Sequence, residues 1–323
     1  MPASQSLTDD PSRYALRSAQ LGAVLWLLLL AWQLPSLFSP TWAQMMLLLA
    51  ALVHVPLALR LIEPDGTWVT LRATWRLAVL WQMPAAILLV PACLLEPNWS
   101  AVIVTFPWLL TTMLIALVGA LRVRLEGWRS WQETAISAGL IYVAIGGVWL
   151  LLDRLGARPL HFDPIIVTLT AIHFHYAGFL LPIFAGLVGK ELRNRLATLA
   201  ACGVVCGVPL VALGITTTQL GFAPLIEAFA VWLTSLAGLL VAMLHVRLAC
   251  ESHLSAGTRV CFAFCGIALA GSMILSAMYG ARFYWHLEWL DLPWMRALHG
   301  TANALGFGLV GVFGWSLKSR TAI

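Results

Sequence analysis

Two histidines and a tyrosine lie inside one long apolar run of this 323-residue chain. The segment 170–182 reads TAIHFHYAGFLLP and contains His173, His175 and Tyr176. Imidazole and phenol groups transfer protons, form hydrogen bonds and, in the case of histidine, bind metals. A polar side chain in hydrocarbon costs about 2 to 4 kcal/mol unless it finds a partner. These residues are therefore the first candidates for a functional site.

A second polar group lies in the last apolar run, where His299 and Asn303 precede Gly306. This i, i+4, i+7 spacing places the imidazole and the amide on one helix face, beside a glycine that allows close approach. Glu227 lies about one turn inside another apolar run. The sequence predicts a substrate-binding site formed by six residues. They are His173, His175, Tyr176, His299, Asn303 and Glu227.

The composition shows which elements must position these groups. The chain is 61% hydrophobic and 10% charged, with a mean hydropathy of +0.88, whereas soluble domains carry roughly 25% charged residues. A membrane-spanning helix needs about 20 mainly apolar residues, and backbone in hydrocarbon must satisfy its own hydrogen bonds. The sequence therefore predicts an all-α polytopic membrane bundle of about ten helices. The expected spans are 18–38, 42–60, 74–94, 100–121, 134–152, 164–189, 196–217, 222–246, 256–280 and 294–316.

The basic residues predict the orientation of these helices. Most of the 19 Lys and Arg residues fall on one side of a ten-helix arrangement. Cytoplasmic loops are enriched in Lys and Arg, so both termini are predicted to be cytoplasmic. We expect a tail at 1–17 without a cleavable signal peptide, one transmembrane domain at 18–316 and a tail at 317–323. Without any organelle address, a bacterial inner membrane is the predicted location.

Helix geometry predicts the depth of the site and a constraint on it. His173 and His175 lie about nine to eleven residues into a helix that enters from outside, or roughly 14 to 17 Å deep. Residues two positions apart on a regular helix differ in direction by about 200°. The imidazoles of His173 and His175 therefore cannot share one cavity unless the helix is distorted. Pro182 clashes with the carbonyl of Gly178 and predicts such a distortion. The site is expected in helices of 164–316, in the outer half of the bilayer.

Both motifs resemble those of the YndJ-like family of bacterial multi-pass membrane proteins. The segment 170–182 carries this resemblance together with 298–308, which reads LHGTANALGFG. The resemblance is specific in the second half of the chain, while the first half matches as a series of apolar helices. It implies a multi-pass membrane protein and supports the choice of site. The family's transporter-like description rests on topology and implies no mechanism.

Three functions fit these residues. The first is a transporter or permease of a small solute, with proton coupling through imidazole titration as one form of it. The second is an intramembrane enzyme acting on a lipid or isoprenoid. In that case His173, His175, Tyr176 and His299 are the candidate catalytic acids and bases, with Asn303 as a dipole for developing charge. The third is a protein in which histidines ligate a metal or haem.

Several features limit partners and cofactors. No HExxH or comparable ligand spacing is present, so no metal-binding residues are predicted, and the sequence indicates no particular cofactor. The formal net charge is +5, but the basic residues lie in short loops between apolar runs, so no nucleic-acid partner is expected. The expected partners are the lipid bilayer and an unidentified small molecule or lipid. Four further histidines near helix ends or in loops are interpreted as non-functional. They are His54, His161, His245 and His253.

Overall fold

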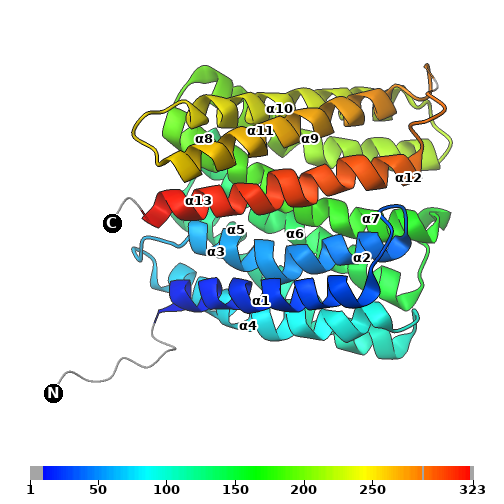
Figure 1. Cartoon of the computed structure of the whole chain (residues 1–323), viewed down its shortest axis with the longest axis horizontal. Helices are drawn as coiled ribbons and strands as arrows, with labels where there is room; N and C mark the ends of the chain where they lie inside the picture. Colours follow the sequence, from blue (N-terminus) through cyan, green and yellow to red (C-terminus); the bar gives the residue numbers. More distant parts are fainter. Residues whose placement is uncertain (1–9, 286, 321–323) are drawn as a thin grey trace.

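Helices make up all the regular structure in the described part of the chain. The structure is a computed structural model that describes residues 10–285 and 287–320 (Figure 1). Within these residues, nine helices are long and apolar enough to cross a membrane. They are Pro11–Gln33 (α1), Pro40–Leu61 (α2, η1 and α3), Val69–Leu94 (α4), Trp99–Glu126 (α5), Trp131–Leu155 (α6), Pro164–Leu192 (α7, η3 and α8), Arg195–Gln219 (α9), Leu225–Ala249 (α10) and Ala256–Gly280 (α11).

A tenth helical span completes the bundle. It runs through α12 (Leu292–Trp294), η4 (Met295–Gly300), η5 (Ala302–Leu309) and α13 (Val310–Arg320). A short 3₁₀ turn, η2 (Pro159–His161), precedes α7. The start of α1 and the end of α13 lie at the same end of the bundle, as an even number of spans requires (Figure 1). The predicted all-α polytopic membrane fold is confirmed.

The first helix begins earlier than its apolar run. The Asp10 carboxylate accepts hydrogen bonds from the backbone amides of Ser12 and Arg13, and Pro11 occupies the first helical position. Residues 11–17 of the predicted N-terminal tail are therefore helical, and 317–320 of the C-terminal tail belong to α13. The remaining parts of these tails, 1–9 and 321–323, lie outside the described residues.

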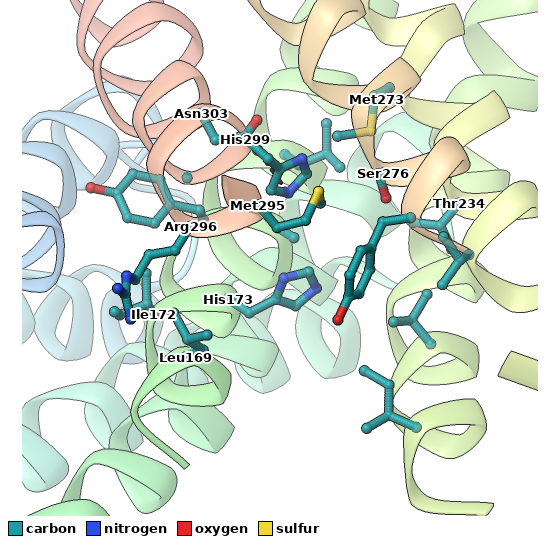
Figure 2. Close-up of a pocket in the computed structure, with 18 of the residues that line it drawn as sticks. Leu169, Ile172, His173, Thr234, Met273, Ser276, Met295, Arg296, His299 and Asn303 are labelled. Carbon is teal, nitrogen blue, oxygen red and sulfur yellow. Dashed lines mark hydrogen bonds between the residues drawn. The ribbon is translucent and has the colours of Figure 1, made fainter. Parts of the chain in front are cut away.

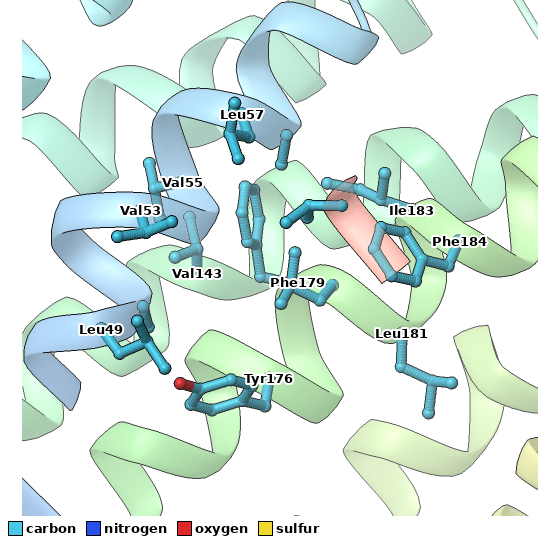
Figure 3. Packing of buried hydrophobic residues seen from close by; sticks show 14 of the residues in the cluster. Leu49, Val53, Val55, Leu57, Val143, Tyr176, Phe179, Leu181, Ile183 and Phe184 are labelled. Atoms are coloured by element: carbon cyan, nitrogen blue, oxygen red, sulfur yellow. The ribbon is translucent and has the colours of Figure 1, made fainter. Parts of the chain in front are cut away.

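Two spans form the centre of the bundle. In the 18-residue apolar stretch of each span, 94% of the residues are buried in Pro40–Leu61 and 83% in Pro164–Leu192. In the other candidate spans the share is 33 to 61%. Figure 3 shows the two central spans packed through side chains such as Leu49 and Val53 against Phe179 and Ile183. The last span joins this centre, because Trp42 Nε1 of α2 donates to Thr301 Oγ1 at 2.8 Å.

The central spans share an irregular backbone. Each contains π-helical turns: Ala50–His54 (η1), Tyr176–Leu180 (η3), and η4 with η5 in the last span. η5 packs against both η1 and η3, so the irregular segments meet inside the bundle. Pro56 and Pro182 follow the first two, and proline removes a backbone donor and disfavours a regular helix before it. The predicted distortion near Pro182 occurs as the π-helical turn η3, a feature frequent at functional sites.

Aromatic packing fills the half of the bundle nearer the chain ends. The rings of Phe184 and Phe307 meet edge to face with centroids 5.1 Å apart. Phe262 and Trp315 pack at 4.8 Å, and His245 contacts both. Apart from Trp315, which is 4% exposed, these side chains are 0 to 1% exposed. Close packing of this kind leaves little room for a polar path through this half of the molecule.

Candidate binding site

Two neighbouring cavities lie towards the end of the bundle opposite the chain termini. The first has a volume of about 240 Å³ and lies between α7, η3, α10, α11 and the last span. The second has a volume of about 690 Å³ and lies between α6, α7 and α9. They share wall residues that include His173, Glu227, Tyr279 and Arg282. Five of the six residues predicted for the site line the first cavity: His173, Tyr176, Glu227, His299 and Asn303.

His173 is the imidazole available to a ligand. Figure 2 shows His173 of α7 and His299 of η4 directed into the same space, with Met295 between them. The His173 ring contacts the edge of Phe174, and no hydrogen bond joins it to any other described residue. Because its side chain is only partly buried at the cavity wall, both ring nitrogens are free to bind a solute.

The last span presents an ordered polar group instead. His299 Nδ1 donates to the backbone carbonyl of Ser272 at 2.9 Å, and the Asn303 amide donates to Ser272 Oγ at 2.6 Å. The same amide lies 3.1 Å from His299 Nε2, which accepts from it when Nδ1 carries the proton. Within this network, the side-chain carbonyl oxygen of Asn303 is the polar atom of His299 and Asn303 that has no hydrogen-bond partner among the described residues. The predicted i, i+4 face is therefore a preorganised acceptor.

Tyr176 closes the inner side of the first cavity. Its hydroxyl donates to the backbone carbonyl of Met46 at 2.8 Å, which ties η3 to α2. Met46 and Arg296 also line the cavity. Helix α2 therefore contributes to a site that the sequence placed only within helices of 164–316.

The structure places His175 outside both cavities. Its ring is fully buried, Nδ1 donates to the Ala171 carbonyl at 2.7 Å, and Nε2 accepts from Trp108 Nε1 at 3.1 Å. The two histidines of the motif thus face opposite sides of α7, as the predicted 200° rotation requires. His245 has the same pattern, since it donates to Val241 and accepts from Trp315. We assign both residues to interhelical packing, and His175 leaves the candidate site.

Glu227 is held by a cation at the cavity wall. Arg282 Nη2 lies 2.5 Å from Glu227 Oε1, and the Arg282 guanidinium stacks over the rings of Tyr279 and Phe283 at 4.3 and 4.0 Å. Glu227 is 4% exposed, and this pair offsets the cost of burying its carboxylate. The pair links α10 to the end of α11 where the two cavities join.

His54 is a buried polar residue that the sequence interpretation missed. It lies in η1, is fully buried, and neither ring nitrogen has a hydrogen-bond partner among the described residues. Its ring meets Tyr176 edge to face at 5.4 Å, beside Gly308 of η5. The available signal was Pro56, which predicts an irregular backbone at this depth.

No metal centre is formed by the described residues, since no three His, Cys, Asp or Glu side chains among them gather closely enough to hold an ion. His173 and His299 meet without a third ligand. The first cavity combines these few polar groups with mainly apolar walls, a composition typical of small-molecule sites.

The nine long apolar helices among the described residues define a multi-pass protein of the inner membrane, which confirms the predicted location. The chain belongs to the YndJ-like protein family, which matches residues 45–307 and so includes much of the first half. It is similar to the uncharacterized membrane protein YndJ of Bacillus subtilis (strain 168), with 32% identity over 216 residues. This match covers 65% of the chain and 38% of the relative, so the chain spans well under half of that protein. No solved structure matches the chain significantly.

Proposed function

We propose that the chain transports a small solute through a site in the outer half of the membrane. The supporting observation is the asymmetry of the bundle: the two cavities that hold the candidate residues lie towards the end opposite the termini, and packed aromatic side chains such as Phe262 and Trp315 lie nearer the termini. With the termini in the cytoplasm, this arrangement corresponds to the outward-facing state of an alternating-access transporter. His173, Tyr176, Glu227, His299 and Asn303 form the proposed site.

The irregular central spans support the same proposal. Transporters commonly bind their solutes at interrupted helices near the bilayer midplane, where neighbouring segments move against each other. Here η1, η3 and η5 meet below the cavity, and each interrupts a span that would otherwise be rigid. We assign the gate to these turns, and we assign both site and gate to a single transmembrane domain, 18–316.

Uptake into proteoliposomes tests this function. We would compare the wild-type chain, the His173→Phe variant and empty liposomes across carboxylated, phosphorylated, cationic and neutral amphipathic solutes, with mass spectrometry as the readout. We expect saturable, time-dependent uptake of at least one solute. The His173→Phe variant should reduce it by about 10- to 100-fold, because it removes the free hydrogen-bonding group and keeps the bulk. Tight binding without flux for every solute would contradict transport.

One observation favours an intramembrane enzyme as the second candidate. The larger cavity is lined mainly by apolar residues such as Ile145, Trp149 and Leu213, and the inner half of the bundle is packed. A dead-end apolar cavity with a free imidazole suits general acid-base chemistry on a lipid or isoprenoid, with His173 as the acid or base. In that case membrane extracts of cells expressing His173→Ala should accumulate a substrate that wild-type cells convert. Identical lipid profiles would count against catalysis.

A further inference from the structure

We propose that the ligand of this site is an amphipathic anion, a molecule with one carboxylate or phosphate group on an apolar body, bound at Arg296. This inference names the substrate class and rests on the proposed function only for the cavity itself. It concerns equilibrium binding and does not require transport. The argument combines the charge balance of the cavity walls, the contacts of Arg296 and the apolar character of the larger cavity.

The cavity walls carry unequal charge. The charged residues among them are one carboxylate, Glu227, and two guanidinium groups, Arg282 and Arg296. Arg282 is fully engaged, since it pairs with Glu227 at 2.5 Å, donates to the Tyr279 carbonyl at 3.1 Å and stacks on two rings. The Glu227 charge is thereby compensated. The positive charge that remains in the cavity belongs to Arg296.

Arg296 has no carboxylate within ion-pair distance among the described residues, although the more distant Asp291 acts on its charge. Arg296 is 9% exposed, and none of the ion pairs among the described residues includes it. Nη2 donates to the backbone carbonyl of Phe38, and Nε is buried without a hydrogen-bond partner in the described chain. Figure 2 shows the side chain reaching from the last span to Ile172 at the edge of the cavity. A buried charge without a counterion is costly, and an anionic ligand that enters the cavity would compensate it.

The rest of the ligand must be largely apolar. Next to the polar groups of the first cavity, the second offers about 690 Å³, within the range of small-molecule sites. Its walls include Ile145, Trp149, Phe174 and Leu213. An apolar body gains free energy by leaving water for such a surface. The anionic group would lie at Arg296, with the Asn303 and His173 side chains available for neutral polar atoms.

Binding of matched probes tests the charge and the apolar body separately. The full chain in phosphatidylcholine nanodiscs would be titrated with dodecyl phosphate, dodecanoate, dodecanol, dodecyltrimethylammonium and inorganic phosphate, with thermal unfolding followed by tryptophan fluorescence. We expect dodecyl phosphate or dodecanoate to bind about 10- to 100-fold more tightly than dodecanol, because hydrogen bonds to charged groups contribute most. Inorganic phosphate should bind at least about tenfold more weakly than the dodecyl anions, since it lacks the apolar body.

Substitutions assign the effect to Arg296. Arg296→Gln should remove the preference for anions over dodecanol, and Arg296→Lys should keep part of it. Arg158→Gln, which removes an exposed guanidinium outside the cavity walls, should leave the preference unchanged and controls for overall charge. Equal binding of dodecanol and the anions, tighter binding of the cationic probe, or an anion preference that persists in Arg296→Gln would overturn the proposal. Inorganic phosphate binding as tightly as dodecyl phosphate would overturn the amphipathic part.

The outcome is separable from that of the transport proposal. Anion binding at Arg296 without uptake of any solute would leave this inference standing and contradict transport. Uptake of neutral or cationic solutes alone, without anion binding, would overturn this inference and leave the transport proposal standing. A lower unfolding temperature of Arg296→Gln without any probe would show that the arginine also holds the Phe38 loop. The Arg296→Lys comparison then still decides the inference, because loss of the anion preference in that variant would overturn it.

Discussion

The histidines differ chiefly in their hydrogen-bond partners. His175 and His54 are both fully buried, yet the first has partners for both ring nitrogens and the second has none in the described chain. A buried polar group without a partner costs about 1 to 3 kcal/mol, so its retention calls for a role other than stability. We infer that His54, which contacts Tyr176 below the cavity, belongs to the proposed gate. His175 acts as a structural bridge to Trp108.

Matched substitutions test this difference. His175→Phe should lower the free energy of unfolding by about 1 to 2 kcal/mol, because it leaves the Trp108 indole N–H without an acceptor. His54→Phe should leave it unchanged or raise it, since it removes two unsatisfied nitrogens and keeps an aromatic ring beside Tyr176. Denaturant titration of both variants in the same detergent measures the effect. A larger loss for His54→Phe than for His175→Phe would contradict the assigned roles.

Local geometry explains what the sequence could predict at this scale. The opposite directions of His173 and His175 follow from 100° per residue and are confirmed. The pairing of His299 with Asn303 follows from their i, i+4 spacing. His54 was interpreted as non-functional because it lies within two turns of the predicted helix end at residue 60, whereas packing against Tyr176 and Gly308 buries it. Ser272 was missed because its role depends on how α11 packs against the last span.

At the scale of elements, close backbone approach holds the irregular spans in place. Gly22 of α1 lies against the backbone of η1, where a Cβ atom would overlap the carbonyl oxygen of Leu52. Small residues allow membrane helices to approach in this way. The number and approximate positions of the spans were predictable from apolar length. The π-helical turns were not, apart from the proline signals, because they arise where three spans pack together.

Two glycine substitutions test this contact. Gly22→Ala should lower the free energy of unfolding by about 1 to 3 kcal/mol, because α1 must move away from η1. Gly271→Ala is the matched control: it lies in α11 with no atom within 4 Å of an added Cβ, and alanine is the better helix former. It should be neutral or slightly stabilising. Thermal unfolding of the two purified variants provides the comparison, and equal effects would show that Gly22 does not set this packing.

At the scale of the whole molecule, an ion-pair network and the two cavities of the candidate site lie at opposite ends. Glu133 binds Arg122 at 2.8 Å and Lys190 at 2.7 Å, which joins α5, α6 and α8 at the end where the chain termini lie. The positive-inside rule places this end in the cytoplasm. The distribution of Lys and Arg along the sequence predicted which end of the bundle faces the cytoplasm. The cavity itself could not be predicted, because it depends on α2 packing between α7 and the last span.

Thiol labelling tests the central claim, a cavity open to the outside and closed to the cytoplasm. Ser276→Cys, on the cavity wall in Figure 2, would be combined with native Cys250 in a chain whose other cysteines are replaced. A membrane-impermeant maleimide should modify Cys at position 276 in right-side-out vesicles and Cys250 only in inside-out vesicles. Modification at position 276 only from the cytoplasmic side, or from neither side while Cys250 reacts as expected, would contradict the account.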